Sequence, residues 1–451
     1  MKIDLYHLHR GLHFTRLTYP IVLDVLRTWA EASGWSARVS VCQEAGVDLA
    51  TEADVVGISV YTQTAPAAYR VAAALRRRGK VVFFGGPHFR GDSTVAEASP
   101  FCDVIAGSID EAQFRGLLAE VAAGRLRPGG PPRLVRDVAN RFRYPQDFRQ
   151  SLRSRRWYQI PTIPTSLGCP YDCEFCAAYL QGRYVLRDVD AVRNEVAHAP
   201  GRVVLFSDAT FGLNTRWTMA LMDAIAPLGK RIAVETTVGR VRDPAVLRAL
   251  ARGGVRWIVV GVETLTRRLR KHGAADVEHG LADVVGRAHD LGMVVQGNFI
   301  CGLDSDGPES FEDIYEHYER TRLDAIMIGI LTPYPDTGIF RDLHAQGRII
   351  DTAWEHYDCH HVVYRPRRMT VDQLVDGYIG LYRALRRRKS ALREIWEGIA
   401  THGVRAESLL MIGNNLYQKY DSITKTRNLR RNQRELASHA TSPARLEALR
   451  A

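Results

Sequence analysis

The sequence predicts an α/β protein that consists of two successive α/β segments and a C-terminal helical region. Apolar runs of strand length alternate with helical periodicity through the first 125 residues, and a second alternation begins at residue 159. Alternation of this kind is typical of parallel sheets covered by helices. The chain has 451 residues, enough for two domains, and its 46% hydrophobic and 25% charged residues are typical of a globular protein.

The first segment, residues 1–125, predicts a doubly wound, Rossmann-like domain. Its strand candidates are 2–8, 37–42, 55–61, 80–86 and 102–107. Two intervening stretches, 19–34 and 64–79, have helical periodicity and end in glycine, a helix stop signal. In a sheet of this kind ligands bind at the carboxyl ends of the strands.

The second segment predicts a partial barrel. Residues 126–158 are rich in proline, glycine and arginine, which favours a linker between domains. The strand candidates that follow recur about every thirty residues, with helical segments between them: 160–168, 203–208, 231–237, 257–263, 294–302 and 325–332. Six units are too few for an eight-stranded barrel, so we predict a partial (β/α)6 barrel over residues 159–345. Residues 346–451 are mainly helical in pattern.

Polar side chains collect where the barrel strands end. In parallel barrels the chemistry takes place at the carboxyl ends of the strands. The polar residues at or near these ends are Asp208, Glu235, Glu263, Asn298 and Asp304. The sequence therefore predicts an active site at this edge of the second sheet.

Three of the seven cysteines lie on one short stretch. Cys169, Cys173 and Cys176 have the spacing C-x3-C-x2-C directly after the first barrel strand. Structural zinc needs four ligands, no second cysteine pair follows, and the distant Asp-Cys-His-His segment 358–361 has poor ligand spacing. Three thiolates suit a 4Fe–4S cluster whose fourth iron stays open to a ligand that is not protein.

The motif C-x3-C-x-aromatic-C after the first strand of a six-unit barrel resembles the radical S-adenosylmethionine (SAM) superfamily. The resemblance covers roughly residues 155–370. It implies that the open iron binds the amino and carboxylate groups of SAM. It also implies that one electron cleaves SAM, and that the resulting 5′-deoxyadenosyl radical abstracts a hydrogen atom from the substrate.

The same resemblance implies cofactor-binding residues. Phe175, inside the cysteine motif, would pack near the adenine, and Asp208 of FSDATF would lie at the SAM amine. Glu263 of GVET resembles the acidic position near the ribose, and Asp304 of GNFICGLDSD takes the acid's place in the fifth-strand element. Tyr334 of TPYPDT would lie close to SAM.

The N-terminal segment resembles the cobalamin-binding domain that precedes many radical SAM barrels. The resemblance rests on VVFFGGPHF (81–89) and CDVIAGSIDEAQFRGLL (102–118). Gly85 and Gly86 would let the backbone approach a ligand closely, and Ser59 and Thr62 could hydrogen-bond a nucleotide tail.

Two features of this segment depart from the pattern. The sequence has no D-x-H-x-x-G motif, and the Arg- and His-rich stretch 7–20 follows the first strand in place of a Pro-rich opening. Both a cobalamin site and a retained scaffold without its ligand therefore stay open at this point.

Arrangement and length resemble the radical SAM diol dehydratases of aminoglycoside antibiotic biosynthesis, such as that of apramycin biosynthesis. This implies 1,2-diol dehydration of an amino sugar such as paromamine, for which a carboxylate-rich barrel mouth is complementary in charge. The chemistry needs a base and an acid, and Glu235, Asn298 and Tyr334 are the candidate catalytic residues. A one-electron donor such as a flavodoxin, and a separate NADPH reductase acting on the product, would be the partners.

The alternative is a cobalamin-dependent radical SAM C-methyltransferase of secondary metabolism, because the same scaffold serves it. A third hypothesis, a non-catalytic iron–sulfur or zinc module, is disfavoured by the vacant ligand position and by the segments expected to contact SAM.

Charge and hydrophobic patterning argue against a nucleic acid partner, a membrane span and a secretory signal. The net charge of +11 is concentrated in arginine-rich helical runs without interleaved aromatics, so no nucleic acid partner is expected. No apolar run reaches eighteen residues, so no membrane span is expected. The N-terminus lacks the pattern of a secretory signal, which favours the cytoplasm.

Overall fold

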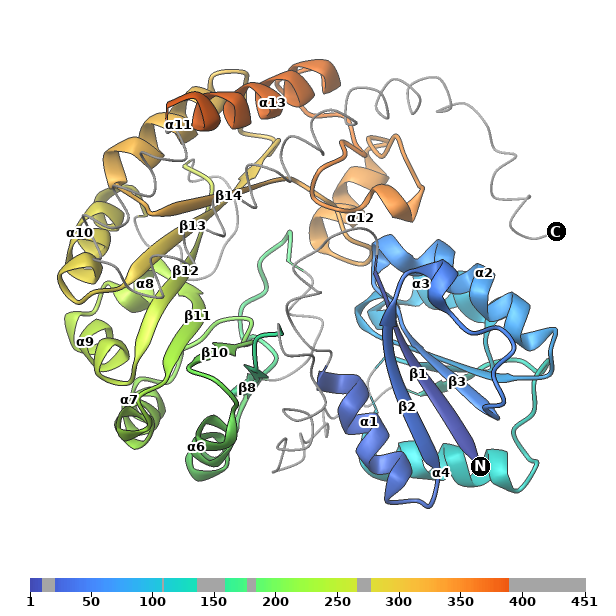
Figure 1. The fold of residues 1–451 in the computed structure, drawn as a ribbon. Helices are drawn as coiled ribbons and strands as arrows, with labels where there is room; N and C mark the ends of the chain where they lie inside the picture. The colour runs from blue at the N-terminus through green and yellow to red at the C-terminus, as the bar shows by residue number, and fades with distance from the viewer. Residues whose placement is uncertain (10–20, 108, 136–158, 177–183, 266–276, 389–451) are drawn as a thin grey trace. The chain divides into compact units, whose positions relative to one another are not determined.

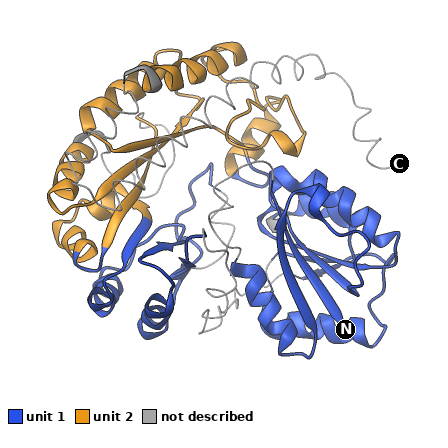
Figure 2. Ribbon diagram, in the orientation of Figure 1, with its two compact units in different colours: residues 1–234, 252–254, 334–337 blue, residues 235–251, 255–333, 338–451 orange. Residues whose placement is uncertain are grey.

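The structure, a computed structural model, describes residues 1–9, 21–107, 109–135, 159–176, 184–265 and 277–388. The chain divides into two compact units (Figure 2). The first comprises residues 1–234, 252–254 and 334–337, and the second comprises residues 235–251, 255–333 and the chain from 338 onward. The domain boundaries drawn from the sequence stay predictions.

The first unit contains a parallel six-stranded sheet with the strand order β2-β1-β3-β4-β5-β6 (Figure 1). The strands are β1 (Lys2–Leu8), β2 (Ser36–Cys42), β3 (Val55–Ser59), β4 (Val81–Gly85), β5 (Val104–Ala106) and β6 (Arg133–Val135). The helices are α1 (Ile21–Glu31), α2 (Ala65–Arg76), α3 (Asp92–Ala98) and α4 (Glu111–Ala122). Short 3-10 turns are η2 (Glu44–Gly46), η3 (Thr62–Thr64), η4 (Pro87–Arg90) and η5 (Ser99–Phe101). The predicted doubly wound fold is confirmed. β6 was not predicted and lies within the range expected to be a linker.

One face of this sheet packs against α1 and α4. Ile3 and Leu5 of β1 share a buried cluster with Trp29 of α1 and Phe114 of α4. The rings of Trp29 and Phe114 lie 6.2 Å apart. Burial of each such side chain contributes about 1.5–3 kcal/mol, which explains why these apolar runs form strands and helices here.

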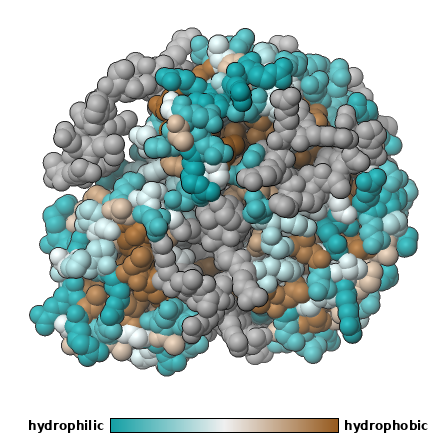
Figure 3. Space-filling model, turned by 180° about the vertical axis from the view of Figure 1, so that it is seen from behind, coloured by the Kyte–Doolittle hydropathy of each residue, from teal (hydrophilic) through white to brown (hydrophobic). Residues whose placement is uncertain are grey.

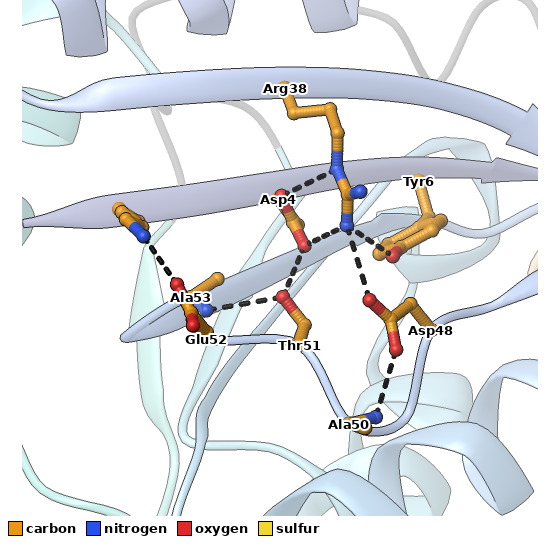
Figure 4. A network of polar contacts seen from close by, with 9 residues as sticks. Asp4, Tyr6, Arg38, Asp48, Ala50, Thr51, Glu52 and Ala53 are labelled. Atoms are coloured by element: carbon orange, nitrogen blue, oxygen red, sulfur yellow. Dashed lines mark hydrogen bonds and ion pairs between the residues drawn. The ribbon is translucent and has the colours of Figure 1, made fainter.

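A polar network joins β1 to the edge strand β2 (Figure 4). Asp4 is 6% exposed, and both of its carboxylate oxygens accept hydrogen bonds from the Arg38 guanidinium, at 3.0 and 2.5 Å. The Thr51 hydroxyl donates to the same carboxylate at 2.6 Å and accepts from the Ala53 N–H at 3.1 Å. Because a buried carboxylate without partners is costly, this network is what allows Asp4 inside the sheet.

The six predicted barrel strands form a second sheet with the order β14-β13-β12-β11-β10-β7. They are β7 (Thr162–Ile163), β10 (Val203–Phe206), β11 (Arg231–Thr237), β12 (Val255–Glu263), β13 (Val294–Cys301) and β14 (Ala325–Ile330). β7 and β11 pair with β10, and β12 and β14 pair with β13, in each case in parallel, so the predicted partial barrel is confirmed. A separate antiparallel pair consists of β8 (Ser166–Leu167) and β9 (Val185–Leu186).

Helices follow the strands, as expected of β–α units. They are α6 (Val189–His198), α7 (Thr215–Ile225), α8 (Val238–Val241), α9 (Pro244–Arg252), α10 (Val277–Asp290), α11 (Ser310–Thr321), α12 (Gly338–Ala345) and α13 (Val371–Arg388), with 3-10 turns η7 (Ala226–Leu228) and η8 (Trp354–His356). The predicted C-terminal helical region is described as far as the end of α13.

β14 lies at one edge of the second sheet, and the segment after it covers that edge. The hydroxyls of Tyr378 and Tyr382 on α13 donate to the Ile328 carbonyl at 3.3 and 3.0 Å. The Ile330 N–H donates to the Cys359 carbonyl at 2.8 Å. Covering an edge in this way satisfies backbone groups that would otherwise pair with another chain.

Few large hydrophobic side chains are exposed in the part of the chain that the structure describes. On the face in Figure 3 hydrophobic areas are separated by hydrophilic ones. Large hydrophobic residues exposed among the described ones are Met1, Val22, Tyr61, Leu134, Val185 and Met327. Within the described ranges, no helix combines the length and the apolar character that a membrane crossing requires.

Candidate active site

The cysteine loop begins directly after β8. Gly168 has φ of +69°, a conformation that favours glycine, and it turns the chain from the strand into Cys169. The Cys176 N–H donates to the Cys173 carbonyl at 3.0 Å, which closes a tight turn. Cys173 is buried, whereas Cys169 and Cys176 are half-buried. The loop therefore holds three thiols at the end of a strand, two of them partly accessible.

Asp208 lies two residues after β10 and is 4% exposed. Its Oδ1 accepts hydrogen bonds from the Thr165 N–H at 3.2 Å, the Thr165 hydroxyl at 2.9 Å and the Ser166 hydroxyl at 2.5 Å. Its Oδ2 is buried and has no hydrogen-bond partner among the described residues. An orphaned buried carboxylate oxygen is a position where a cationic group of a ligand fits.

Burial raises the pKa of Asp208 to about 6, while the hydrogen bonds from Ser166 and Thr165 oppose that rise. A carboxyl group in this state is destabilised when it ionises without a counter-charge. A ligand ammonium at Oδ2 would supply the counter-charge. Thr165 and Ser166 were not singled out in the sequence, although two adjacent hydroxyl residues shortly before Cys169 were a visible signal.

A buried ion pair supports the same strand end. Arg187 donates to both carboxylate oxygens of Glu195, at 2.9 and 2.6 Å, and to the Pro164 carbonyl at 2.7 Å. Side-chain exposure is 7% for the arginine and 0% for the glutamate. A bidentate pair of this kind fixes geometry. It therefore holds the backbone next to Thr165, the residue that orients Asp208.

The cysteine loop and the β10 end are neighbours. The Cys169 sulfur lies 3.9 Å from the Thr210 hydroxyl oxygen, two residues beyond Asp208. The structure thus brings Cys169 and Asp208 to one region of the first unit. Within the described ranges no three Cys, His, Asp or Glu side chains converge into a preformed metal site. By donor chemistry, three thiols on one loop nevertheless fit an iron–sulfur cluster.

Glu263 is the last residue of β12 and has a strained backbone. Its φ is +63°, and the Thr264 N–H donates to the Val262 carbonyl at 2.8 Å, so the chain makes a γ-turn centred on Glu263. The pairing of β12 with β13 is irregular at the same point. A non-glycine residue held in this conformation is costly and is often found at functional sites. This geometry is compatible with the predicted role of Glu263.

Asn298 and Glu235 lie within strands rather than after them. Asn298 is the fifth residue of β13 and is half-buried, and its Oδ1 accepts from the Gln296 side-chain amide at 2.9 Å. Gln296, which the sequence analysis did not single out, is 6% exposed on the same strand face. Glu235 is the fifth residue of β11 and is exposed.

Asp304 and Asp306 follow the end of β13, and their carboxylates have different hydrogen-bond partners. The Asp304 carboxylate is 45% exposed and forms a bidentate pair with Arg348 at 2.6 and 2.8 Å. Asp306 is 5% exposed and accepts from the N–H groups of Gly302 and Leu303, at 2.9 and 3.0 Å. Burial raises the pKa of Asp306. The acid that shapes this turn is therefore Asp306, which the sequence analysis missed, and Asp304 points to Arg348.

The remaining predicted cofactor residues, Phe175 and Tyr334, are both half-buried. The Tyr334 carbonyl accepts from the N–H and the hydroxyl of Thr337, at 3.2 and 2.7 Å. This turn fixes the backbone next to the tyrosine, four residues after β14.

The histidines after the barrel form pairs within the protein. His356 bonds to Asp351 at 2.6 Å, His361 to Asp358 at 3.1 Å, and His360 to the Tyr378 hydroxyl at 2.8 Å. These hydrogen bonds order the segment that covers the β14 edge. They explain why histidines occupy these three positions.

In the first sheet, Gly86 serves packing. Its φ is +111°, and a Cβ there would lie 2.6 Å from the Val60 carbonyl oxygen, so the close approach predicted for a ligand is made by the chain itself. The Thr62 hydroxyl is 3.3 Å from His88 Nδ1. The predicted contacts of Ser59 and Gly85 with a nucleotide stay predictions.

Residues 163–351 match the family model of the radical SAM superfamily. This segment is a radical SAM domain. The match confirms SAM and a 4Fe–4S cluster as the cofactors that the cysteine motif predicted. It contains Asp208, Glu263, Asn298 and all three cysteines of the motif.

Two relatives are bacteriochlorophyllide d methyltransferases of Chlorobaculum tepidum. The C-12(1)-methyltransferase is 27% identical over 345 residues, which cover 73% of this chain and 74% of that protein. The C-8(2)-methyltransferase is 23% identical and covers 70% of this chain and 74% of that protein. Among solved structures, the radical SAM methyltransferase TsrM from Kitasatospora setae, with cobalamin and a 4Fe–4S cluster bound, has a TM-score of 0.59 at 17% identity. That likeness covers 76% of this chain and 75% of TsrM and supports the fold.

These comparisons bear on the two functional hypotheses differently. They confirm a radical SAM enzyme, and they favour the methyltransferase alternative over the diol dehydratase that the whole-chain resemblance suggested.

Proposed function

We propose that this protein is a cobalamin-dependent radical SAM methyltransferase that alkylates a carbon atom of a small organic substrate. The observation that carries the proposal is the length of the match to the C-12(1)-methyltransferase. Its 345 aligned residues extend well beyond the radical SAM domain and cover about three quarters of both chains. A dehydratase of amino sugars has only the sequence resemblance in its favour.

The residues of the first unit give the site its binding groups. Cys169, Cys173 and Cys176 hold the iron–sulfur cluster, and Asp208 receives the SAM ammonium at its unpartnered Oδ2. When bound, the cluster and SAM supply the radical that removes a hydrogen atom, and the corrinoid supplies the methyl group. The hydroxyls of Thr165 and Ser166 hold the carboxylate of Asp208 in place before SAM arrives.

The remaining predicted residues have proposed roles of their own. Glu263, held in its γ-turn, accepts from the ribose hydroxyls, and Phe175 packs near the adenine. Asn298, fixed by Gln296, and Glu235 and Tyr334 contact the substrate. A one-electron donor such as a flavodoxin supplies the reducing equivalent. A separate NADPH reductase is required only by the dehydratase hypothesis.

The N-terminal domain fits a corrinoid by its topology. In the strand order β2-β1-β3-β4-β5-β6, the chain leaves β1 through α1 toward β2 on one side, whereas it leaves β3 through α2 toward β4 on the other. A crevice forms at the carboxyl ends of the strands where the order reverses, and ligands of doubly wound domains bind there.

The test is the visible spectrum of the reconstituted protein. The protein is loaded anaerobically with iron and sulfide, mixed with hydroxocobalamin and desalted. The proposal expects about one corrinoid retained per chain. The triple variant with Cys169, Cys173 and Cys176 replaced by alanine is the matched control, since it should lose the cluster and keep the corrinoid. Formation of 5′-deoxyadenosine from SAM by protein that retains no corrinoid would overturn the proposal and favour the dehydratase.

A further inference from the structure

The two faces of β13 have different surroundings. A Cβ on Gly297 would lie 2.7 Å from a methyl carbon of Leu323, just after the end of α11, and the Phe299 ring lies 6.1 Å from a histidine ring of α11. Helices α10 and α11 lie on this side of the strand (Figure 1). Because side chains alternate along a strand, Gln296 and Asn298 face the opposite side, which is the inner face of the barrel sheet.

The strand register places Asn298 between Gly261 and Met327. Asn298 is level with Gly261 of β12 on one side and with Met327 of β14 on the other. Met327 is 47% exposed, whereas Ile326 and Ile328 on the other face of β14 are buried. The inner face is therefore accessible directly beside Asn298. Methionine is an adaptable apolar side chain that suits a binding surface.

A buried neighbour orients the Asn298 amide. Gln296 is 6% exposed, and its Nε2 donates to the Asn298 Oδ1 at 2.9 Å. Asn298 itself is half-buried, and no described residue accepts a hydrogen bond from its Nδ2. An asparagine side chain offers one acceptor oxygen and one NH2 group with two donors. Since Gln296 engages the oxygen, the group that Asn298 presents to a ligand is the donor pair on Nδ2.

We propose that Asn298 donates through Nδ2 to an oxygen of the substrate, and that Met327 supports an apolar part of the same molecule. The inference rests on the proposed function and deepens it by naming the substrate class, a carbon-rich compound with a carbonyl or carboxylate oxygen. An ammonium group has donors only, so it has no hydrogen bond to make with Nδ2. Gln296 is a positioning residue, because it sets which end of the Asn298 amide faces the substrate.

The test compares two probes with the same apolar skeleton, cinnamate and cinnamylammonium. The full chain is reconstituted with iron, sulfide and hydroxocobalamin, SAM is added without reductant, and the binding of each probe is measured by equilibrium dialysis. The inference expects saturable binding of cinnamate, about 10- to 150-fold tighter than that of cinnamylammonium, which is the range for a hydrogen bond to a charged group.

Two variants separate the donor from the residue that orients it. Asn298→Asp places a carboxylate oxygen where the donor pair lies, so the preference should reverse in favour of cinnamylammonium. Gln296→Met removes the group that orients the amide, so cinnamate affinity should fall without a reversal. Asn214→Asp is the matched control, since it is the same substitution at the exposed N-cap of α7, where the Oδ1 accepts from the Trp217 N–H. This control should keep the preference for cinnamate.

SAM affinity is measured in the same samples and should be unchanged in each variant, which shows that the variants fold. Absence of cinnamate binding, equal binding of the two probes, or an unchanged preference in Asn298→Asp would overturn the inference. A loss of SAM affinity in Asn298→Asp would also overturn it, because Asn298 would then contact SAM. These outcomes leave the proposed function intact, since that is judged by corrinoid retention. A chain that prefers cinnamate but retains no corrinoid would overturn the proposed function alone.

Discussion

Asp208→Asn separates a structural role of this residue from a role in SAM binding. Asparagine keeps the shape of the side chain and one carbonyl oxygen that can accept from Thr165 and Ser166. It removes the negative charge and places an N–H2 group where the unpartnered Oδ2 lies.

The stability effect follows from the pKa of Asp208. Burial raises it from 3.8 to about 6, so the folded state holds the proton more tightly than the unfolded state does. Stability is therefore lost as the pH rises from about 4 to about 6, and at neutral pH the loss amounts to about 3 kcal/mol. The asparagine variant does not incur that loss, but a buried amide N–H2 without a partner costs about 1–3 kcal/mol. Without SAM, the variant should be between equally stable and about 2 kcal/mol more stable at neutral pH.

The effect on SAM affinity has the opposite sign. A hydrogen bond to a charged group contributes about 1.5–3 kcal/mol, so the variant should bind SAM about 10- to 150-fold more weakly. Affinity of the unsubstituted protein for SAM should rise with pH through about 6, because only the ionised carboxylate attracts the ammonium. The variant should lack that pH dependence.

The assay is equilibrium titration of SAM into reconstituted protein without reductant, between about pH 5 and pH 8, with chemical denaturation of the same samples. Asp223→Asn is the control, since Asp223 lies on α7 with its side chain 65% exposed. Unchanged SAM affinity in Asp208→Asn would refute the reasoning and leave Asp208 a structural residue.

Three further predictions concern the cluster and the fold. Cys173→Ala should abolish the visible absorbance of the reconstituted cluster and the cleavage of SAM, measured as 5′-deoxyadenosine, because two thiolates cannot replace three. Gly86→Ala should lower the free energy of unfolding by at least about 2 kcal/mol in urea, because its Cβ would lie 2.6 Å from the Val60 carbonyl oxygen at φ of +111°. Thr51→Val should cost about 1–3 kcal/mol in the same assay, because the buried Asp4 carboxylate loses a donor.

Each of these variants has a control in the chain. Cys102 is a buried thiol outside the loop, and Cys102→Ala should keep the cluster. Gly229 has φ of +61° with open space around it, so Gly229→Ala should cost only about 1 kcal/mol. Thr51→Ser keeps the hydroxyl and should be nearly neutral. Equal losses in a variant and its control would contradict the stated cause.

The fold could be predicted from the sequence because its strands are buried apolar runs. The predicted strand 2–8 coincides with β1, and 231–237 coincides with β11. β6 was missed because its three residues, Arg133–Val135, are exposed or half-buried and stand in a segment rich in proline and glycine. This strand forms because it pairs with β5, and a pairing between distant segments is not visible in the local sequence.

The site was predictable only where spacing carries the chemistry. The cysteine spacing predicted the cluster that the family match supports, whereas the roles of Asp208 and Glu263 at the strand ends stay predictions. Contacts between distant segments were not visible: Thr165 and Asp208 meet because β7 pairs with β10, and nothing in either segment encodes that distance. The sequence also could not show which of the two acids after β13 shapes the turn. Only the folded turn shows that Asp306 faces inward and that Asp304 faces Arg348.

The most direct test of the central claim is the fate of SAM. The products are quantified after reduction, with and without a bound corrinoid. A methyltransferase of the proposed kind uses one SAM molecule as the methyl donor and another as the source of the radical. S-adenosylhomocysteine should therefore form beside 5′-deoxyadenosine. S-adenosylhomocysteine should form only when the protein carries the corrinoid. If 5′-deoxyadenosine forms alone, at the same rate with and without corrinoid, the account is contradicted and the enzyme abstracts hydrogen without transferring a methyl group.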